Sequence, residues 1–181
     1  EYKDMSDLLS ALESLPKGRV YSGIGSPGLV GDITWNTDYG IGCSHIQSWL
    51  HVEGLDMMGT RYHPYSLNAK LLLEFDEARE EQYNIFNVRY VIAPEGVNFP
   101  DFVKPIGKFG RHLLYQVETT GYFDLVGSEM AFAGSKNDLS PAASTWLSSG
   151  LPELKLHPGI FLNEGDPGET GIPLVDARES I

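Results

Sequence analysis

The segment from residue 83 to residue 94, YNIFNVRYVIAP, constrains the fold of this chain most, because two kinds of secondary structure meet in it. The residues just before it, 74–81, are rich in helix formers. By contrast, Val88, Tyr90 and Ile92 are β-branched or aromatic, and Pro94 closes the run. We therefore predict a helix that leads directly into a buried core strand.

A short amphipathic helix and a strand are predicted at the start of the chain. Met5, Leu8 and Leu12 recur at spacings of three and four residues, and the Pro-Lys-Gly sequence at 16–18 ends the pattern. Residues 19–22 then favour a strand. No clean periodicity follows until about residue 65, which predicts a long ordered loop region after the first strand. Because long loops in compact domains usually serve binding, we expect a functional site there.

The rest of the chain alternates helical with extended patterns. It predicts a helical segment over 65–86 broken near Phe75 and Asp76, strands over 88–93, 102–107, 112–117 and 123–126, a helix over 140–147 and an extended piece over 159–162. This alternation favours an α/β or α+β fold, with a mixed β-sheet flanked by short helices. We expect a single domain over residues 1–162. Residues 163–181 are expected to form a Gly/Pro-rich C-terminal tail or the start of a following segment.

Composition narrows the classes of partner. The 181 residues are 41% hydrophobic, enough for a sizeable core, and carry a formal net charge of −12. That charge repels phosphate backbones, so we expect no nucleic-acid partner. No run approaches the roughly 18 apolar residues that a membrane-spanning helix needs. Cys43 is the only cysteine, so neither an internal disulfide nor a cysteine-based zinc site can form within the sequence.

Aromatic, acidic and other polar side chains gather in the predicted loop region. Flat aromatic faces beside carboxylates suit the rings and hydroxyls of sugars. The candidate ligand-binding residues are Trp35, Asp38, Tyr39, His45, Trp49, Arg61 and Tyr62. The alternative interpretation is structural, since the same aromatic rings would pin down a long loop by becoming buried.

Two further patterns in this region are typical of cofactor or metal sites, and we favour neither interpretation. The G-x-G-x-x-G spacing over residues 23–28 matches a dinucleotide-binding turn, but the residues that follow do not continue as the helix that such a turn requires. His45, His51 and His63 lie near several carboxylates, but spacings of six and twelve residues fit no short chelate. We therefore expect no cofactor and no metal ion.

An enzyme is the competing interpretation. In a free-standing soluble hydrolase or metal-dependent enzyme, Asp38, His45 and His51 would converge in one pocket. No Gly-x-Ser-x-Gly elbow supports a serine nucleophile. We expect this fragment not to be catalytic by itself.

Several short motifs, taken in order, resemble a known family. They are Gly18-Arg19-Val20-Tyr21 after a helix, Gly54-Leu55-Asp56, Arg61-Tyr62, the segment over 83–92, Leu113-Leu114-Tyr115-Gln116-Val117, and Trp146-Leu147. In this order they resemble the extracytoplasmic part of YfhO-like and related GT-C-type glycosyltransferase-like membrane proteins of bacteria. The resemblance covers roughly residues 5–162, and its motifs are structural.

The resemblance implies a membrane context for the chain. The full protein would carry many transmembrane helices before this fragment and use a lipid-linked sugar donor at the outer face of the membrane. No residue here matches the catalytic acidic motif of such enzymes, so no catalytic role is carried over. The fragment would be an accessory extracytoplasmic domain whose partners are the remainder of its own chain and cell-envelope glycan or a lipid-linked sugar.

Overall fold

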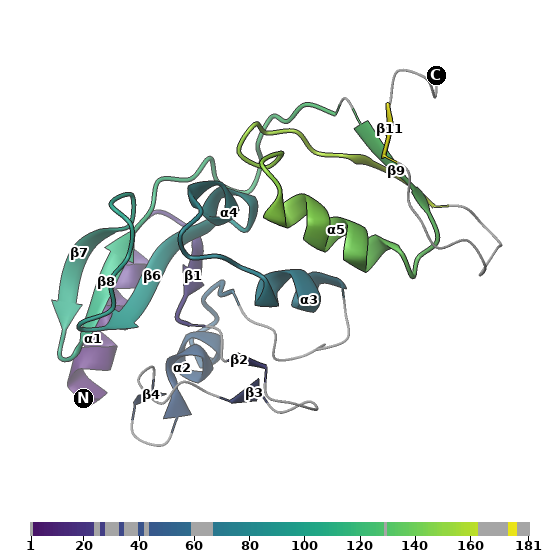
Figure 1. Cartoon of the computed structure of the whole chain (residues 1–181). Helices are drawn as coiled ribbons and strands as arrows, with labels where there is room; N and C mark the ends of the chain where they lie inside the picture. Colours follow the sequence, from purple (N-terminus) through teal and green to yellow (C-terminus); the bar gives the residue numbers. More distant parts are fainter. Residues whose placement is uncertain are drawn as a thin grey trace. The chain divides into compact units, whose positions relative to one another are not determined.

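The computed structural model describes residues 2–23, 26–27, 33–34, 40–41, 44–58, 67–128, 130–162 and 174–176. The chain divides into two compact units, Glu1–Tyr122 and Phe123–Ile181, which we call unit 1 and unit 2 (Figure 1). Each unit has its own sheet, so each is described by itself. Compact units can belong to one folding domain, so the single domain over residues 1–162 stays a prediction.

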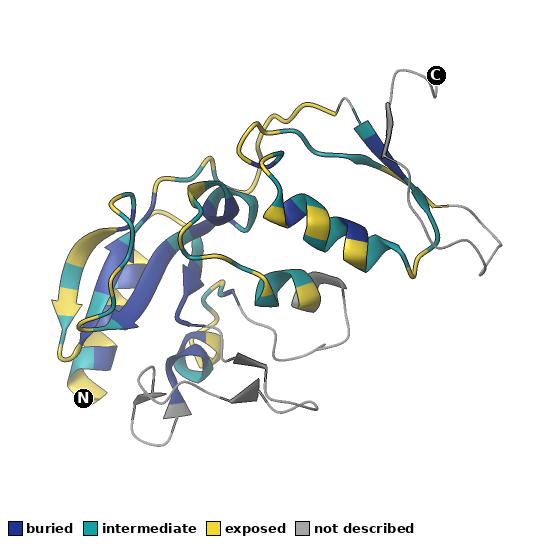
Figure 2. Cartoon of the chain, in the orientation of Figure 1, coloured by how far each residue is buried: buried dark blue, intermediate teal, exposed yellow. Residues whose placement is uncertain are grey.

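A four-stranded mixed sheet forms the centre of unit 1. Its order is β1 (Arg19–Tyr21), β6 (Val88–Pro94), β8 (His112–Gln116) and β7 (Lys104–Phe109). β1 pairs with β6 in parallel, whereas β8 is antiparallel to both of its neighbours. The predicted core strand is confirmed as β6, in which Val88, Val91 and Ile92 are fully buried. Figure 2 shows the same strand as an almost continuous buried band.

Two helices cover one face of this sheet. α1 (Tyr2–Ser14) buries Met5, Leu8 and Leu12, and α2 (Ile46–Val52) buries Ile46 and Leu50. These side chains share one hydrophobic cluster with residues of the sheet, namely Val20, Tyr90, Ile92 and Leu114. The predicted first helix is therefore confirmed, and its apolar stripe faces the core as its spacing requires.

An aromatic cluster covers the other face. The ring of Phe75 lies 4.9 Å from that of Tyr83 and 5.8 Å from that of Phe86, measured between ring centres. The Tyr83 hydroxyl donates to the Glu77 carbonyl at 3.1 Å. These contacts hold the turn between α3 (Leu67–Leu73) and α4 (Glu80–Ile85), where the sequence predicts a break in the helix. The break is therefore confirmed.

Two residues, Phe86 and the left-handed Asn87, join α4 to β6. Asn87 has a φ of 52°, in the region that asparagine tolerates better than most residues. The helix ends at Ile85 with Phe86 as its C-cap, and the Asn87 carbonyl accepts from the Arg19 amide at 3.0 Å, which connects the junction to β1. The abrupt change from helix to strand thus takes place within two residues.

The region predicted as a long loop contains short elements. β2 (Ser26–Pro27) pairs with β3 (Ile33–Thr34), and β4 (Gly40–Ile41) pairs with β5 (Ser44–His45). The helix α2 follows directly, although the sequence analysis did not predict it. Seven residues give only two turns, too few for a clear helical periodicity. The predicted fold class, a mixed sheet with short flanking helices, is confirmed.

Unit 2 is a small sheet with one helix. β9 (Met130–Gly134) lies between β10 (Gly159–Leu162), which is parallel to it, and β11 (Leu174–Asp176), which is antiparallel. α5 (Leu139–Ser148) confirms the predicted helix, and the Trp146 indole donates to the Leu156 carbonyl at 2.9 Å. None of the described helices of the chain is both long and apolar enough to cross a membrane.

The strand predicted over residues 123–126 is wrong. Phe123 and Leu125 are each 92% exposed, and this segment forms no ladder with any described strand. The alternation of apolar residues predicted a strand with one buried face, but here both apolar side chains face solvent. Gly127 forms only an isolated bridge with Leu156.

The stability of unit 2 is expected to depend on pH through His157. The ring of His157 packs against Trp146 at 4.8 Å, and its burial lowers its pKa, an effect that the nearby Asp124 carboxylate opposes. Because the unfolded chain then binds the proton more readily, stability is highest above about pH 6.5 and falls as the pH drops toward the folded-state pKa. The protection factors of amide hydrogen exchange over α5 and β9, which correct for the slower intrinsic exchange at lower pH, should fall on this acidification and do so less in His157→Gln. An equal effect of acidification on the wild type and on His157→Gln would show that His157 does not cause the pH dependence.

Candidate functional site

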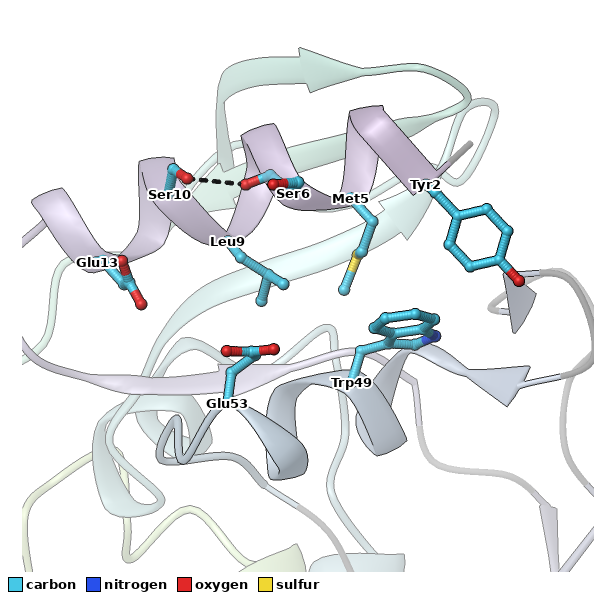
Figure 3. Close-up of a pocket in the computed structure, with 8 residues that line it drawn as sticks. All are labelled: Tyr2, Met5, Ser6, Leu9, Ser10, Glu13, Trp49 and Glu53. Carbon is cyan, nitrogen blue, oxygen red and sulfur yellow. Dashed lines mark hydrogen bonds between the residues drawn. The ribbon is translucent and has the colours of Figure 1, made fainter.

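A groove of about 270 Å³ lies between α1 and α2 in unit 1 (Figure 3). Its floor is apolar and its rim is polar. Eight residues line it: Tyr2, Met5, Ser6, Leu9, Ser10, Glu13, Trp49 and Glu53. The groove therefore combines aromatic, hydroxyl and carboxylate groups, which is the mixture that the sequence analysis sought in the loop region.

The sequence of α1 explains its side of the groove. Met5, Leu8 and Leu12 form the buried stripe of this helix. Tyr2, Leu9 and Glu13 recur at spacings of seven and four residues and form the stripe beside it, which is directed toward α2. The Ser10 hydroxyl donates its hydrogen bond to the Ser6 carbonyl at 2.9 Å, within the same helix.

The sequence around α2 explains the other side. The His45 ring caps this helix, its Nδ1 accepting from the Gln47 amide at 3.2 Å. The buried Gln47 side chain donates to the Gly23 carbonyl at 2.9 Å and so attaches the helix to the end of β1. Trp49 and Glu53 are four residues apart and project from the same face into the groove.

The groove is polarised along its length. The Tyr2 and Trp49 rings meet at one end in an edge-to-face contact, with ring centres 5.7 Å apart. Glu13 lies at the other end, and Glu53, the C-cap residue of α2, lies between Glu13 and Trp49 (Figure 3). Both carboxylates are exposed. Aromatic rings and carboxylates in one short groove can contact both the apolar face and the hydroxyls of a sugar.

The structure describes two of the seven predicted ligand-binding residues. Trp49 lines the groove, whereas His45 is buried and serves as the cap of α2. The other five lie outside the described residues: Trp35, Asp38, Tyr39, Arg61 and Tyr62. Ligand binding by the seven residues stays a prediction.

Tyr2 and Glu13 were not among the predicted site residues. Both belong to the first helix, whereas the predicted site residues lie in the long loop region, because loops carry most binding residues. The signal that identifies them is the polar and aromatic stripe directly beside the buried stripe of this helix. This stripe can be recognised as part of a groove only when the structure shows that α2 lies opposite α1.

The enzyme hypothesis depends on Asp38, His45 and His51. Asp38 lies outside the described residues, and the Nδ1 atom of His45 takes part in the cap of α2. His51 is exposed in the last turn of the same helix. Among the described residues, no group of three or more His, Cys, Asp or Glu side chains is placed to hold a metal ion.

The glycine-rich turn after β1 also differs from a nucleotide-binding turn where it is described. Gly23 has a φ of 78°, which glycine adopts readily. Ser26 and Pro27 form β2, a strand, at the place where a dinucleotide-binding turn opens into a helix. Gly25 and Gly28 lie outside the described residues.

A second polar cluster joins three of the motifs that carry the family resemblance. The Arg19 guanidinium contacts the Asp56 carboxylate at 3.3 Å and donates to the Phe86 carbonyl at 2.9 Å. A β-carbon on Gly18 would lie 2.5 Å from that of Arg89, so only glycine allows this close approach. The Tyr122 hydroxyl donates to Asp56 at 2.6 Å, and this bond raises the pKa of Tyr122. These motif residues therefore have structural roles.

Comparison of the chain with family models, with curated proteins and with solved structures gives no significant match.

Proposed function

We propose that this chain is a non-catalytic, extracytoplasmic accessory domain of a glycosyltransferase-like membrane protein, and that it contacts glycan through the groove between α1 and α2. The observation that carries the glycan-binding part is the groove itself, where Trp49 and Tyr2 share one short cavity with two carboxylates.

The chemistry of the groove favours a saccharide over a purely apolar ligand. Sugar rings have an apolar face, which packs on aromatic rings, and hydroxyls at their edges, which donate to carboxylates. Met5 is 3% exposed and lies in the floor, so the floor is backed by the packed core of unit 1. A preformed groove of this kind binds with little reorganisation of the backbone.

The membrane context rests on the resemblance described in the sequence analysis. The meeting of Gly18-Arg19, Asp56 and the segment over 83–92 in one cluster supports the view that these motifs form one structural unit. In this proposal the partners are the membrane-embedded remainder of the chain and a cell-envelope glycan or lipid-linked sugar. The gene upstream of residue 1 is expected to encode apolar segments of about 20 residues, and their absence would remove the membrane context.

The substitution Trp49→Ala is expected to weaken saccharide binding about tenfold, since it removes a half-buried ring that lines the groove. Calorimetric titration with a panel of neutral and charged cell-envelope oligosaccharides measures the effect. Trp49→Phe keeps a ring and should retain most of the affinity. Trp146→Phe changes a tryptophan of unit 2 and is the matched control, for which we expect no change. Binding of no saccharide by the wild-type chain would sink the proposed function.

A further inference from the structure

We propose that the groove between α1 and α2 selects a saccharide that carries free ammonium groups, an oligomer of amino sugars without N-acetyl groups. This inference rests on the proposed function, because it names the class of sugar for the same site. It follows from the distribution of charge, from the two helix C-termini on the acidic side of the groove, and from the length of the groove.

Every charged side chain among the described residues that line the groove is acidic. Glu13 and Glu53 are the two charged residues among the eight, and no Lys or Arg is present in this set. The described ion pairs of unit 1, Arg19 with Asp56, Arg79 with Glu81 and Lys108 with Glu95, use other residues. An ammonium group entering the groove would therefore meet carboxylates with no competing side-chain cation in the lining.

The C-terminal ends of α1 and α2 strengthen the negative electrostatic potential around Glu13 and Glu53. Glu13 lies in the last turn of α1, and Glu53 is the C-cap residue of α2. Figure 3 shows both helices running in the same direction, from their aromatic residue toward their glutamate, so both C-terminal ends lie on the acidic side of the aromatic rings. Backbone carbonyls give a helix C-terminus a partial negative charge, which disfavours an acidic side chain there. A bound cation would relieve this unfavourable arrangement in both helices.

The distance between the aromatic and acidic ends sets the size of the ligand. Tyr2 and Glu13 are eleven residues apart on α1, which corresponds to about 16 Å at 1.5 Å per residue. One sugar ring is too short to reach from the rings of Tyr2 and Trp49 to Glu13, although Glu53 is only four residues from Trp49. A ligand that contacts the aromatic rings and both carboxylates must therefore be an oligosaccharide, with one residue against the rings and near Glu53, and the ammonium group of another near Glu13. An ammonium close to the rings themselves would gain a cation–π contact.

The test compares a glucosamine tetramer with an N-acetylglucosamine tetramer, which has the same backbone without the charge. We expect the wild-type chain to bind the charged tetramer about five- to tenfold more tightly, and the difference to shrink as the salt concentration rises. In the double variant Glu13→Gln, Glu53→Gln, the two tetramers should bind alike. The control Asp7→Asn, Glu118→Gln removes two exposed charges of unit 1 outside the groove and should keep the preference.

The outcomes separate this inference from the proposed function. If both tetramers bind equally and Trp49→Ala weakens both, the preference for ammonium groups is wrong while glycan binding stands. If neither tetramer nor any other saccharide binds, both are wrong. If a tetralysine peptide binds as tightly as the glucosamine tetramer and Trp49→Ala has no effect, the groove recognises charge alone and the saccharide inference is overturned. Circular dichroism of each variant verifies that it is folded.

Discussion

Replacing Tyr83 with alanine is expected to lower the free energy of unfolding by about 3–5 kcal/mol. Tyr83 is fully buried, and its ring lies 4.9 Å from that of Phe75 and 5.3 Å from that of Phe102. The substitution would remove a large ring from the centre of the aromatic cluster and leave a cavity. It would also release the Glu77 carbonyl, to which the hydroxyl donates. Urea denaturation followed by circular dichroism measures the change.

Tyr83→Phe is the matched control for this prediction. It keeps the ring and its packing and removes only the hydrogen bond to Glu77, so we expect a loss of about 1 kcal/mol. If alanine and phenylalanine destabilised the chain equally, the hydrogen bond rather than the packing would dominate at this position. A loss below about 1 kcal/mol for alanine would contradict the described burial.

The second large effect is expected for Leu50→Ala, at about 2–5 kcal/mol. Leu50 is fully buried in α2 and packs in the cluster that joins this helix to α1 and the sheet. The Leu50 carbonyl also accepts from the Leu55 amide at 3.0 Å, so the end of the helix is attached to the chain that follows. Because α2 carries Trp49 and Glu53, loss of this packing would loosen one wall of the groove. Chemical denaturation measures the stability, and saccharide titration measures the groove.

Val52 in the same helix provides the comparison for Leu50. Its side chain is 78% exposed, so Val52→Ala is expected to change the free energy of unfolding by less than about 0.5 kcal/mol. The two substitutions delete apolar atoms from one helix at sites that differ in burial. Equal effects would show that α2 does not dock on the core as described.

The elements that the sequence predicts correctly are those with a local signal. The first helix has a stripe of apolar residues at helical spacing, and β6 has a dense run of β-branched and aromatic residues that ends at Pro94. The hairpin of β7 and β8 is also local, since its strands are joined by the short turn around Gly110, which has a φ of 60°. In each case the information lies within a few residues of the element.

The secondary-structure predictions are wrong or incomplete where tertiary contacts determine whether a strand or helix forms. The segment over 123–126 has the alternation of a strand, but no described strand pairs with it in a ladder. α2 is too short for a periodic signal and is held by Gln47 against the end of β1, a contact between residues 24 positions apart. Neither fact can be read from a local window of sequence.

The candidate site also combines a feature that local sequence predicts with features that depend on tertiary contacts. Trp49 was predicted as a ligand-binding residue because of its type and its neighbours, and it lines the groove. Tyr2 and Glu13 lie 47 and 40 positions before Trp49 and Glu53, respectively, and meet them only because α1 and α2 pack on one face of the sheet. The sequence therefore predicts the aromatic residue on the α2 side of the groove, but it does not predict which residues of α1 lie opposite.

The parallel pairing of β1 with β6 has a consequence for the order of folding. β6 and β8 pair residues about twenty positions apart, such as Ile92 with Leu114, whereas β1 and β6 join Arg19 to Val88. Closing the longer loop costs about 1 kcal/mol more in chain entropy, so the three antiparallel strands are expected to assemble first. The arm that begins with β1 and leads to α2 would dock last. It would then also detach first in a partial opening, so the groove would be lost before the rest of the sheet.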